Sequence, residues 1–205
     1  LSNAVKAFRP RGLFTLRRYN FRIAMAWRKW CSWKITVSVD LDLASRVQAL
    51  EDIEAIKRLK AQWWFACDTR DIAGMRGCYD ESDFLIDFGF IGEFTDMDAF
   101  IDVFESLACH PTHVDMHHGT APEIMMTGPD TAKGRWRMRF QLLETELKQV
   151  QLMSGYYEDE YVRVNGDWKM RVSKYTLMSN LFLSSGEGVV AIEQIGSAPG
   201  LVTEQ

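Results

Sequence analysis

The stretch AKGRWRMRFQL, residues 132–142, alternates small or apolar side chains with charged or polar ones. A period of two places successive side chains on opposite faces of an extended chain. The stretch therefore predicts a long β-strand with one buried face and one wet face. Arg135, Arg137 and Arg139 share the wet face, where we expect a solvated surface or a subunit contact, with a phosphate-binding strip as the lesser alternative.

The sequence on both sides of this stretch continues the pattern of strands. Downstream, period two predicts a strand over 149–164, an Asn-Gly pair typical of a type I′ hairpin turn, and a last strand that begins near Trp168. Upstream, short strands are predicted over 112–118 and 123–127, and a Gly-Pro-Asp turn leads from the second of them into residues 132–142.

Helical periodicity dominates the preceding part of the chain. Apolar residues at three- and four-residue steps predict an amphipathic helix over 43–68, and their positions are Leu50, Ile53, Ile56, Leu59 and Trp63. A short helix is expected over 71–79, followed by a strand over 84–90. Thr95 and Asp96 can cap a third helix, whose apolar face would hold Met97, Phe100, Ile101, Phe104 and Leu107.

This order of helices followed by antiparallel strands predicts an α+β fold. We expect a cone-shaped α+β barrel in which the N-terminal helices pack on a strongly curved antiparallel or mixed sheet. Such an arrangement encloses a pocket suited to a small ligand. The predicted domain covers residues 40–183.

Charge is distributed unevenly along the chain. Residues 1–39 hold nine Lys or Arg and no acidic residue, while the rest holds 15 basic and 28 acidic residues. An acidic body argues against nucleic acid as a partner. For the basic N-terminal extension, 1–39, three interpretations stay open: a cloning or start-site artefact, a packing arm, and a targeting peptide. The Ser-, Gly- and Pro-containing residues 184–205 are expected to form a flexible tail.

Cysteine usage and hydropathy indicate the compartment. The four cysteines contain no C-x-x-C pair, which favours reduced thiols in a cytoplasmic protein over a zinc cage. The sequence contains no run of about 18 apolar residues, so it predicts no membrane span. Nucleotide-binding and serine-hydrolase motifs are also missing from the sequence.

Several short motifs, in consistent order over about 41–183, resemble the SnoaL-like domain of the nuclear transport factor 2-like superfamily. They are the helix end Cys67-Asp68, the Tyr79-Asp80 pair, the run MHHGT at 116–120, and YEDEY at 157–161 before NGDW at 165–168. Within the family, the chain is most similar to hexachlorocyclohexane dehydrochlorinases and more distantly to scytalone and bile acid dehydratases.

The resemblance implies a catalytic pair and no cofactor. In these enzymes an Asp late in the first helix orients a His on a strand, and the His takes a proton in a β-elimination. The matching positions are Asp68 and His117. Trp63 stands where the dehydrochlorinases have a Lys, and Ser173 stands where they have a basic residue. These departures argue against dehydrochlorination as the reaction of this chain.

The residue chemistry fits this role. A neutral imidazole can accept and return a proton near pH 7, and a carboxylate on its far nitrogen fixes the tautomer. The alternative for His117 is a hydrogen-bonded core histidine, and for Asp68 a helix-end cap. The predicted substrate-binding wall, which could equally be plain core, comprises Trp64, Phe84, Met138, Phe140, Met153 and Tyr157. His113 and Asp115 share the strand face of His117, but His-x-Asp-x-His is a weak metal signal and no metal is expected.

These observations predict a cofactor-independent lyase or isomerase acting on a small apolar organic substrate, cyclic substrates included. A His-Asp base serves dehydratase, dehydrohalogenase and cyclase reactions alike, and the departures at Trp63 and Ser173 weaken the dehydrohalogenase alternative. The alternative is a non-catalytic module that binds a small molecule or assembles with proteins, because fold does not determine function. We expect a homodimer or homotrimer and no membrane partner.

Overall fold

The computed structural model describes residues 42–184 of the chain. Its elements are α1 (Leu43–Thr69), α2 (Ile72–Gly77), β1 (Leu85–Asp87), β2 (Glu93–Phe94), α3 (Met97–Ala108), β3 (His113–Gly128), β4 (Thr131–Glu144), β5 (Gln149–Val164) and β6 (Asp167–Ser184). The predicted extension, 1–39, and all but the first residue of the predicted tail, 184–205, lie outside the described residues.

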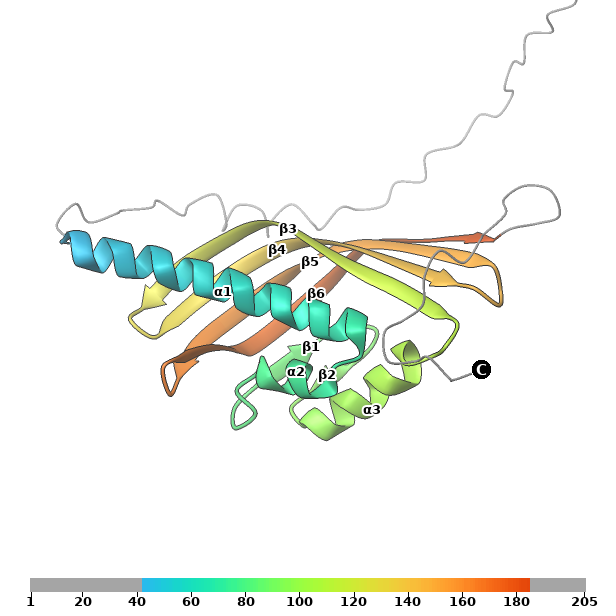
Figure 1. Cartoon of the computed structure of the whole chain (residues 1–205), viewed down its shortest axis with the longest axis horizontal. Helices are drawn as coiled ribbons and strands as arrows, with labels where there is room; N and C mark the ends of the chain where they lie inside the picture. Colours follow the sequence, from blue (N-terminus) through green and yellow to red (C-terminus); the bar gives the residue numbers. More distant parts are fainter. Residues whose placement is uncertain (1–41, 185–205) are drawn as a thin grey trace, which may run out of the picture. The chain divides into compact units, whose positions relative to one another are not determined.

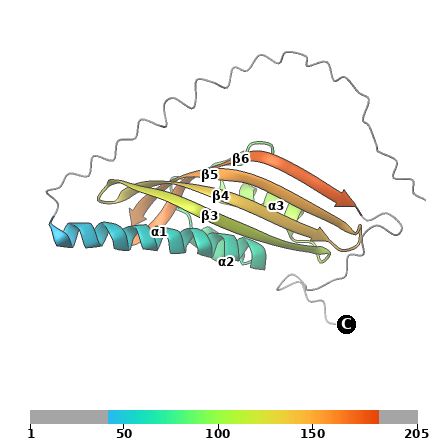
Figure 2. The ribbon, with the colours of Figure 1, turned by 90° about the horizontal axis from the view of Figure 1, so that it is seen from above.

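The six strands form one mixed sheet in the order β2-β1-β6-β5-β4-β3. β1 pairs with β6 in parallel, and every other neighbouring pair is antiparallel. Figure 1 shows the helices on one side of this curved sheet, with α1 lying across it. Figure 2 shows α1 alongside β3. The predicted α+β fold is confirmed, although the sheet stays open and does not close into a barrel.

β4 has the two faces that its sequence predicts. Burial alternates along it, and the buried positions are Ala132, Gly134, Trp136, Met138 and Phe140. The hairpin to β6 is also as predicted, since Asn165 and Gly166 both have positive φ, at 52° and 93°. The remaining face of β4 carries the arginines, and one of them, Arg135, pairs with Glu123 of β3.

The prediction of two separate strands over 112–118 and 123–127 is wrong. Both belong to β3, which runs from His113 to Gly128. Its pairing with β4 shifts register between Thr120 and Glu123, and Ala121 has a φ of 49°. An irregularity of this kind bends a strand without ending it. The polar, proline-containing run between the two predicted strands is therefore a bend within one strand.

The helices match their predicted positions with small differences at the ends. Asp42 caps α1 by accepting a hydrogen bond from the Ser45 backbone N–H at 2.9 Å, and Asp96 caps α3 in the same way. α2 ends at Gly77 rather than at 79, and β1 ends at Asp87 because the chain turns there. The predicted apolar faces include two exposed residues, Leu50 and Leu107, which lie near helix ends beyond the buried core.

Aromatic rings fill the space between α1 and the sheet. Trp63 meets Tyr157 edge to face at a centroid separation of 5.7 Å, and Trp64 meets Trp136 at 5.3 Å. Beneath these rings the Lys60 ammonium lies 2.8 Å from Asp159, and neither side chain is exposed. No helix within residues 42–184 is long and apolar enough to cross a membrane.

Candidate active site

Asp68 and His117 lie in contact, as the resemblance implied. His117 Nδ1 is 2.6 Å from Asp68 Oδ1, and the His117 backbone N–H donates to both carboxylate oxygens at 3.1 Å. The side chains are 14% and 19% exposed, so the pair is largely shielded but open to solvent. Backbone and ring together fix the carboxylate, and hence the orientation of the imidazole.

The fold brings these two residues together from distant points in the sequence. Asp68 lies in the last turn of α1, two residues before the left-handed cap at Arg70 ends the helix. His117 lies on β3 opposite Phe140 of β4, and both side chains face the helix. Because α1 crosses the sheet over β3, its final turn delivers the carboxylate to the strand.

The imidazole rests against aromatic rings. Its centroid is 4.8 Å from that of Phe140 and 6.4 Å from that of Trp63. The rings continue from Trp63 to Tyr157 and then to Tyr175, at 5.7 Å and 4.8 Å. This floor is apolar and would accept a flat hydrocarbon surface better than a charged one.

The predicted wall residues fall into two groups. Phe140 touches His117, and Met153 lies next to Phe140 on the following strand, β5. The other four are buried in the core; they are Trp64, Phe84, Met138 and Tyr157. Of these four, Tyr157 belongs to the aromatic floor, next to Trp63. Phe84 packs on Tyr79 before β1. A wall role for any of these six residues stays a prediction.

Sequence reasoning missed Arg70 as part of this site and gave Asp115 no role beyond a weak metal alternative. The two form an ion pair whose side chains are 6% and 5% exposed, and Asp115 precedes His117 by two residues on the same strand face. The alternation of the strand could have placed Asp115 beside His117. No local pattern signals that Arg70 lies opposite Asp115, because this contact exists only in the folded chain.

His113 and His110 do not complete a metal site. Their rings meet at 4.7 Å, and His110 Nε2 hydrogen bonds with the Ser106 carbonyl at 2.8 Å. Burial lowers the pKa of His113, and the neighbouring His110 lowers it further. Within residues 42–184, no group of three His, Cys, Asp or Glu side chains is arranged to hold a metal ion.

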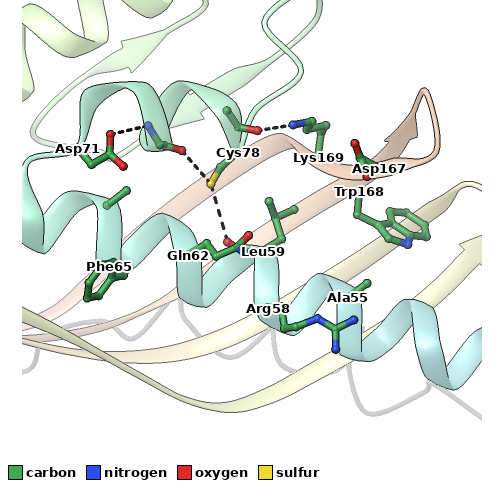
Figure 3. Close-up of a pocket in the computed structure, with 13 residues that line it drawn as sticks. Ala55, Arg58, Leu59, Gln62, Phe65, Asp71, Cys78, Asp167, Trp168 and Lys169 are labelled. Atoms are coloured by element: carbon green, nitrogen blue, oxygen red, sulfur yellow. Dashed lines mark hydrogen bonds between the residues drawn. The ribbon is translucent and has the colours of Figure 1, made fainter.

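Two pockets have neither Asp68 nor His117 among their lining residues. One, of about 510 Å³, is a groove between α1, α2 and the β5–β6 hairpin, lined by Arg58, Gln62 and Lys169 among others (Figure 3). Its Cys78 hydrogen bonds with the Gly74 carbonyl at 3.2 Å, and burial raises the pKa of the thiol to about 11, so it is no thiolate nucleophile at neutral pH. The other, of about 640 Å³, is lined by His118, Arg139, Phe140 and Met153 among others, so it adjoins two of the predicted wall residues.

The geometry of the dyad suits proton transfer. A hydrogen on Nδ1 directed at Asp68 leaves the lone pair on Nε2, and this nitrogen has no hydrogen-bond partner within residues 42–184. The carboxylate stabilises the imidazolium that forms when Nε2 takes a proton. The arrangement can therefore serve a general base facing an apolar surface.

Comparison with known proteins agrees with this fold. The family model of the SnoaL-like domain matches residues 48–174. The hexachlorocyclohexane dehydrochlorinase LinA-type3 from Novosphingobium barchaimii LL02 has a similar structure, with a TM-score of 0.63 and 19% identity, covering 73% of this chain and 99% of that one. A scytalone dehydratase-like protein from Novosphingobium aromaticivorans DSM 12444 gives a TM-score of 0.61 and 19% identity, covering 74% and 97% of the two chains.

Proposed function

The chain belongs to the SnoaL-like domain family, and from this premise we propose that it is a cofactor-independent lyase or isomerase that uses His117 as its general base. Asp68 holds the imidazole in the required tautomer. The observation that carries the proposal is the 2.6 Å contact between His117 Nδ1 and Asp68 Oδ1 at a partly open position.

The proposed reaction is an elimination or a related proton shift. His117 Nε2 removes a proton from a carbon next to the carbon that bears the leaving group. The electrons of the C–H bond form a new double bond, and the leaving group departs with its bonding electrons. Where the leaving group is hydroxide, the imidazolium returns the proton and water is released. General-base catalysis of this kind contributes about 10²–10⁴-fold to the rate.

The substrate class follows from the surroundings of the base. Phe140 and Trp63 flank the imidazole with apolar rings, and Met153 lies beside Phe140. The charged groups beside these rings are paired with one another: the dyad, the Arg70–Asp115 pair, and the buried Lys60–Asp159 pair beneath Trp63 and Tyr157. We therefore expect an uncharged, largely apolar organic substrate, with a cyclic skeleton that can lie flat on the rings.

The test compares two neighbouring histidines. The protein is incubated in D₂O with a panel of polycyclic and halogenated compounds, and mass spectrometry follows deuterium uptake and loss of water or hydrogen halide. His117→Ala should lose about 10²–10⁴-fold of the rate found with the unaltered protein. His118→Ala is the matched control, because His118 lies on the opposite face of the same strand. Both variants should unfold within about 1 kcal/mol of the unaltered protein.

Equal rates in His117→Ala and the unaltered protein would remove the dyad from the mechanism. The alternative would then be a binding or assembly module on the same fold. Exposed apolar side chains on the outer face of the sheet favour this alternative, and they include Met116, Leu181 and Leu183. Self-association as a homodimer or homotrimer stays a prediction under either function.

A further inference from the structure

Arg70 ends α1 in a left-handed conformation, with a φ of 58°, and its guanidinium lies back over the end of the helix. Its Nη1 donates to the carbonyls of Cys67 and Asp68 at 3.1 Å and 2.9 Å. The second of these carbonyls belongs to the dyad residue itself. A helix end leaves its last carbonyls without intrahelical partners, and here one side chain satisfies two of them.

The same guanidinium reaches two further elements. Nη2 donates to the carbonyl of Ala108 at 3.0 Å, at the end of α3. Nη1 also forms the ion pair with Asp115 on β3, two residues before His117. A single side chain thus joins the helix that carries Asp68, the strand that carries His117 and the neighbouring helix α3.

We propose that Arg70 and Asp115 are positioning residues that hold Asp68 and His117 at their contact distance. This inference rests on the proposed function, since it assigns a supporting role to residues beside the proposed base. Neither residue needs to touch substrate. Arg70 fixes the end of α1 through the backbone of Asp68, and Asp115 fixes the strand next to His117.

Geometry gives the reason that such support matters. A displacement of about 1 Å in a catalytic group can cost about 10²-fold in rate. The dyad lies where a helix terminus meets a strand, and helix termini fray unless they are held. An arginine suits the position because its planar group directs several N–H bonds at fixed angles, which a lysine cannot reproduce.

The charges are also balanced locally. Asp68 and Asp115 are both carboxylates on the same side of the sheet, and Arg70 is paired with Asp115 between them. Burial raises the pKa of Asp115, while the Arg70 guanidinium opposes that rise. Without Arg70, Asp115 would be a buried carboxyl group with no cation, and its strand would lose its tie to α1.

The test reads the histidine tautomer directly, so it needs no substrate. Imidazole ¹⁵N shifts report which nitrogen of His117 carries the proton, and His117→Ala assigns the signals. The unaltered protein should hold one tautomer, protonated at Nδ1. Arg70→Lys should give a mixture of tautomers. Arg163→Lys is the matched control, because the Arg163 guanidinium also joins separate elements, through Asp52 of α1 and Asp130 of the β3–β4 turn, but contacts neither dyad residue.

Asp115→Asn provides a second variant in case Arg70→Lys fails to fold, and it should also mix the tautomers. Once a substrate is found, both variants should lower kcat by about 10–10²-fold with KM little changed. A single Nδ1 tautomer in both variants would overturn the inference, as would mixed tautomers in the unaltered protein. If His117→Ala instead keeps full turnover, the proposed function fails, while the tautomer measurement still decides whether Arg70 positions the ring.

Discussion

Two of the ion pairs that connect helix α1 to the sheet differ in their access to solvent. Lys60 and Asp159 are fully buried, and Asp159 also accepts hydrogen bonds from Tyr161 at 2.7 Å and Ser173 at 2.8 Å. The Lys60 ammonium lies 4.0 Å from the ring centroid of Tyr157. Asp68 lies two helical turns farther along, and its side chain and that of His117 are both partly exposed.

This difference in exposure suits the buried pair to stabilising the fold and the partly exposed pair to proton transfer. A buried charge whose partners are all protein groups cannot exchange protons with a substrate, but losing its partner is costly. Burial lowers the pKa of Lys60, and Asp159 opposes that effect. The dyad contributes less to stability because water can replace part of its bonding. Helix α1 therefore carries a structural ion pair and a proposed catalytic pair on one face.

The largest expected effect is on the buried pair. Lys60→Met should lower the free energy of unfolding by about 3–5 kcal/mol, because Asp159 would remain buried without its cation. Urea denaturation followed by circular dichroism measures the change. Lys57→Met is the matched control on the same helix, since Lys57 forms an exposed pair with Glu54, and its effect should stay below about 1 kcal/mol. An unchanged urea midpoint for Lys60→Met would contradict the structural role.

Gly119 lies between the two pairs and sharpens the comparison. A Cβ at this position would lie 1.8 Å from the Trp64 ring, which also faces Lys60. Gly119→Ala should cost about 1–3 kcal/mol through overpacking. Gly77→Ala is the control, because its added Cβ would meet nothing within 4 Å. Equal melting temperatures for the two variants would show that the Trp64 ring can move without cost.

A third carboxylate, Asp52, tests the comparison through pH. Burial raises its pKa, but hydrogen bonds from Arg163, Trp168 and Gln48 outweigh burial, so the net pKa is lowered from 3.8. A lowered folded pKa stabilises the protein above the unfolded value and loses that contribution as pH falls through the folded value. Asp52→Asn should therefore cost about 1–2 kcal/mol at neutral pH. The gap to the unaltered protein should close below pH 3.8, and a gap that persists in acid would refute the assignment.

Local pattern predicted those parts of the fold that depend on neighbouring residues. The alternation of 132–142 gave β4, and the Asn-Gly pair gave the following hairpin. The bend at Ala121 falls in the gap between two predicted strands, because glycine and proline interrupt the period-two pattern there. β2 was not predicted at all, since two residues are too few to show a period.

For the candidate site, too, local sequence pattern predicts less than the tertiary structure shows. The pairing of Asp68 with His117 came from the family resemblance, because no spacing within one chain relates residues 49 positions apart. Lys60 shows the limit most clearly. A lysine within an amphipathic helix predicts an exposed position, yet its partner, Asp159, lies far along the sequence and draws it into the core. Such contacts arise only from the tertiary structure.

The bend in β3 also bears on how the molecule avoids uncontrolled association. β3 is one of the two edge strands of the sheet within residues 42–184, and its 16 residues form a long edge for another chain to join. Pro122 has no N–H to offer an incoming strand, and the left-handed Ala121 beside it interrupts a straight run. The irregularity between the two halves of β3 thus also divides the exposed edge of this strand into two shorter segments. Short edges pair less readily with strands of other molecules, which discourages fibril-like stacking.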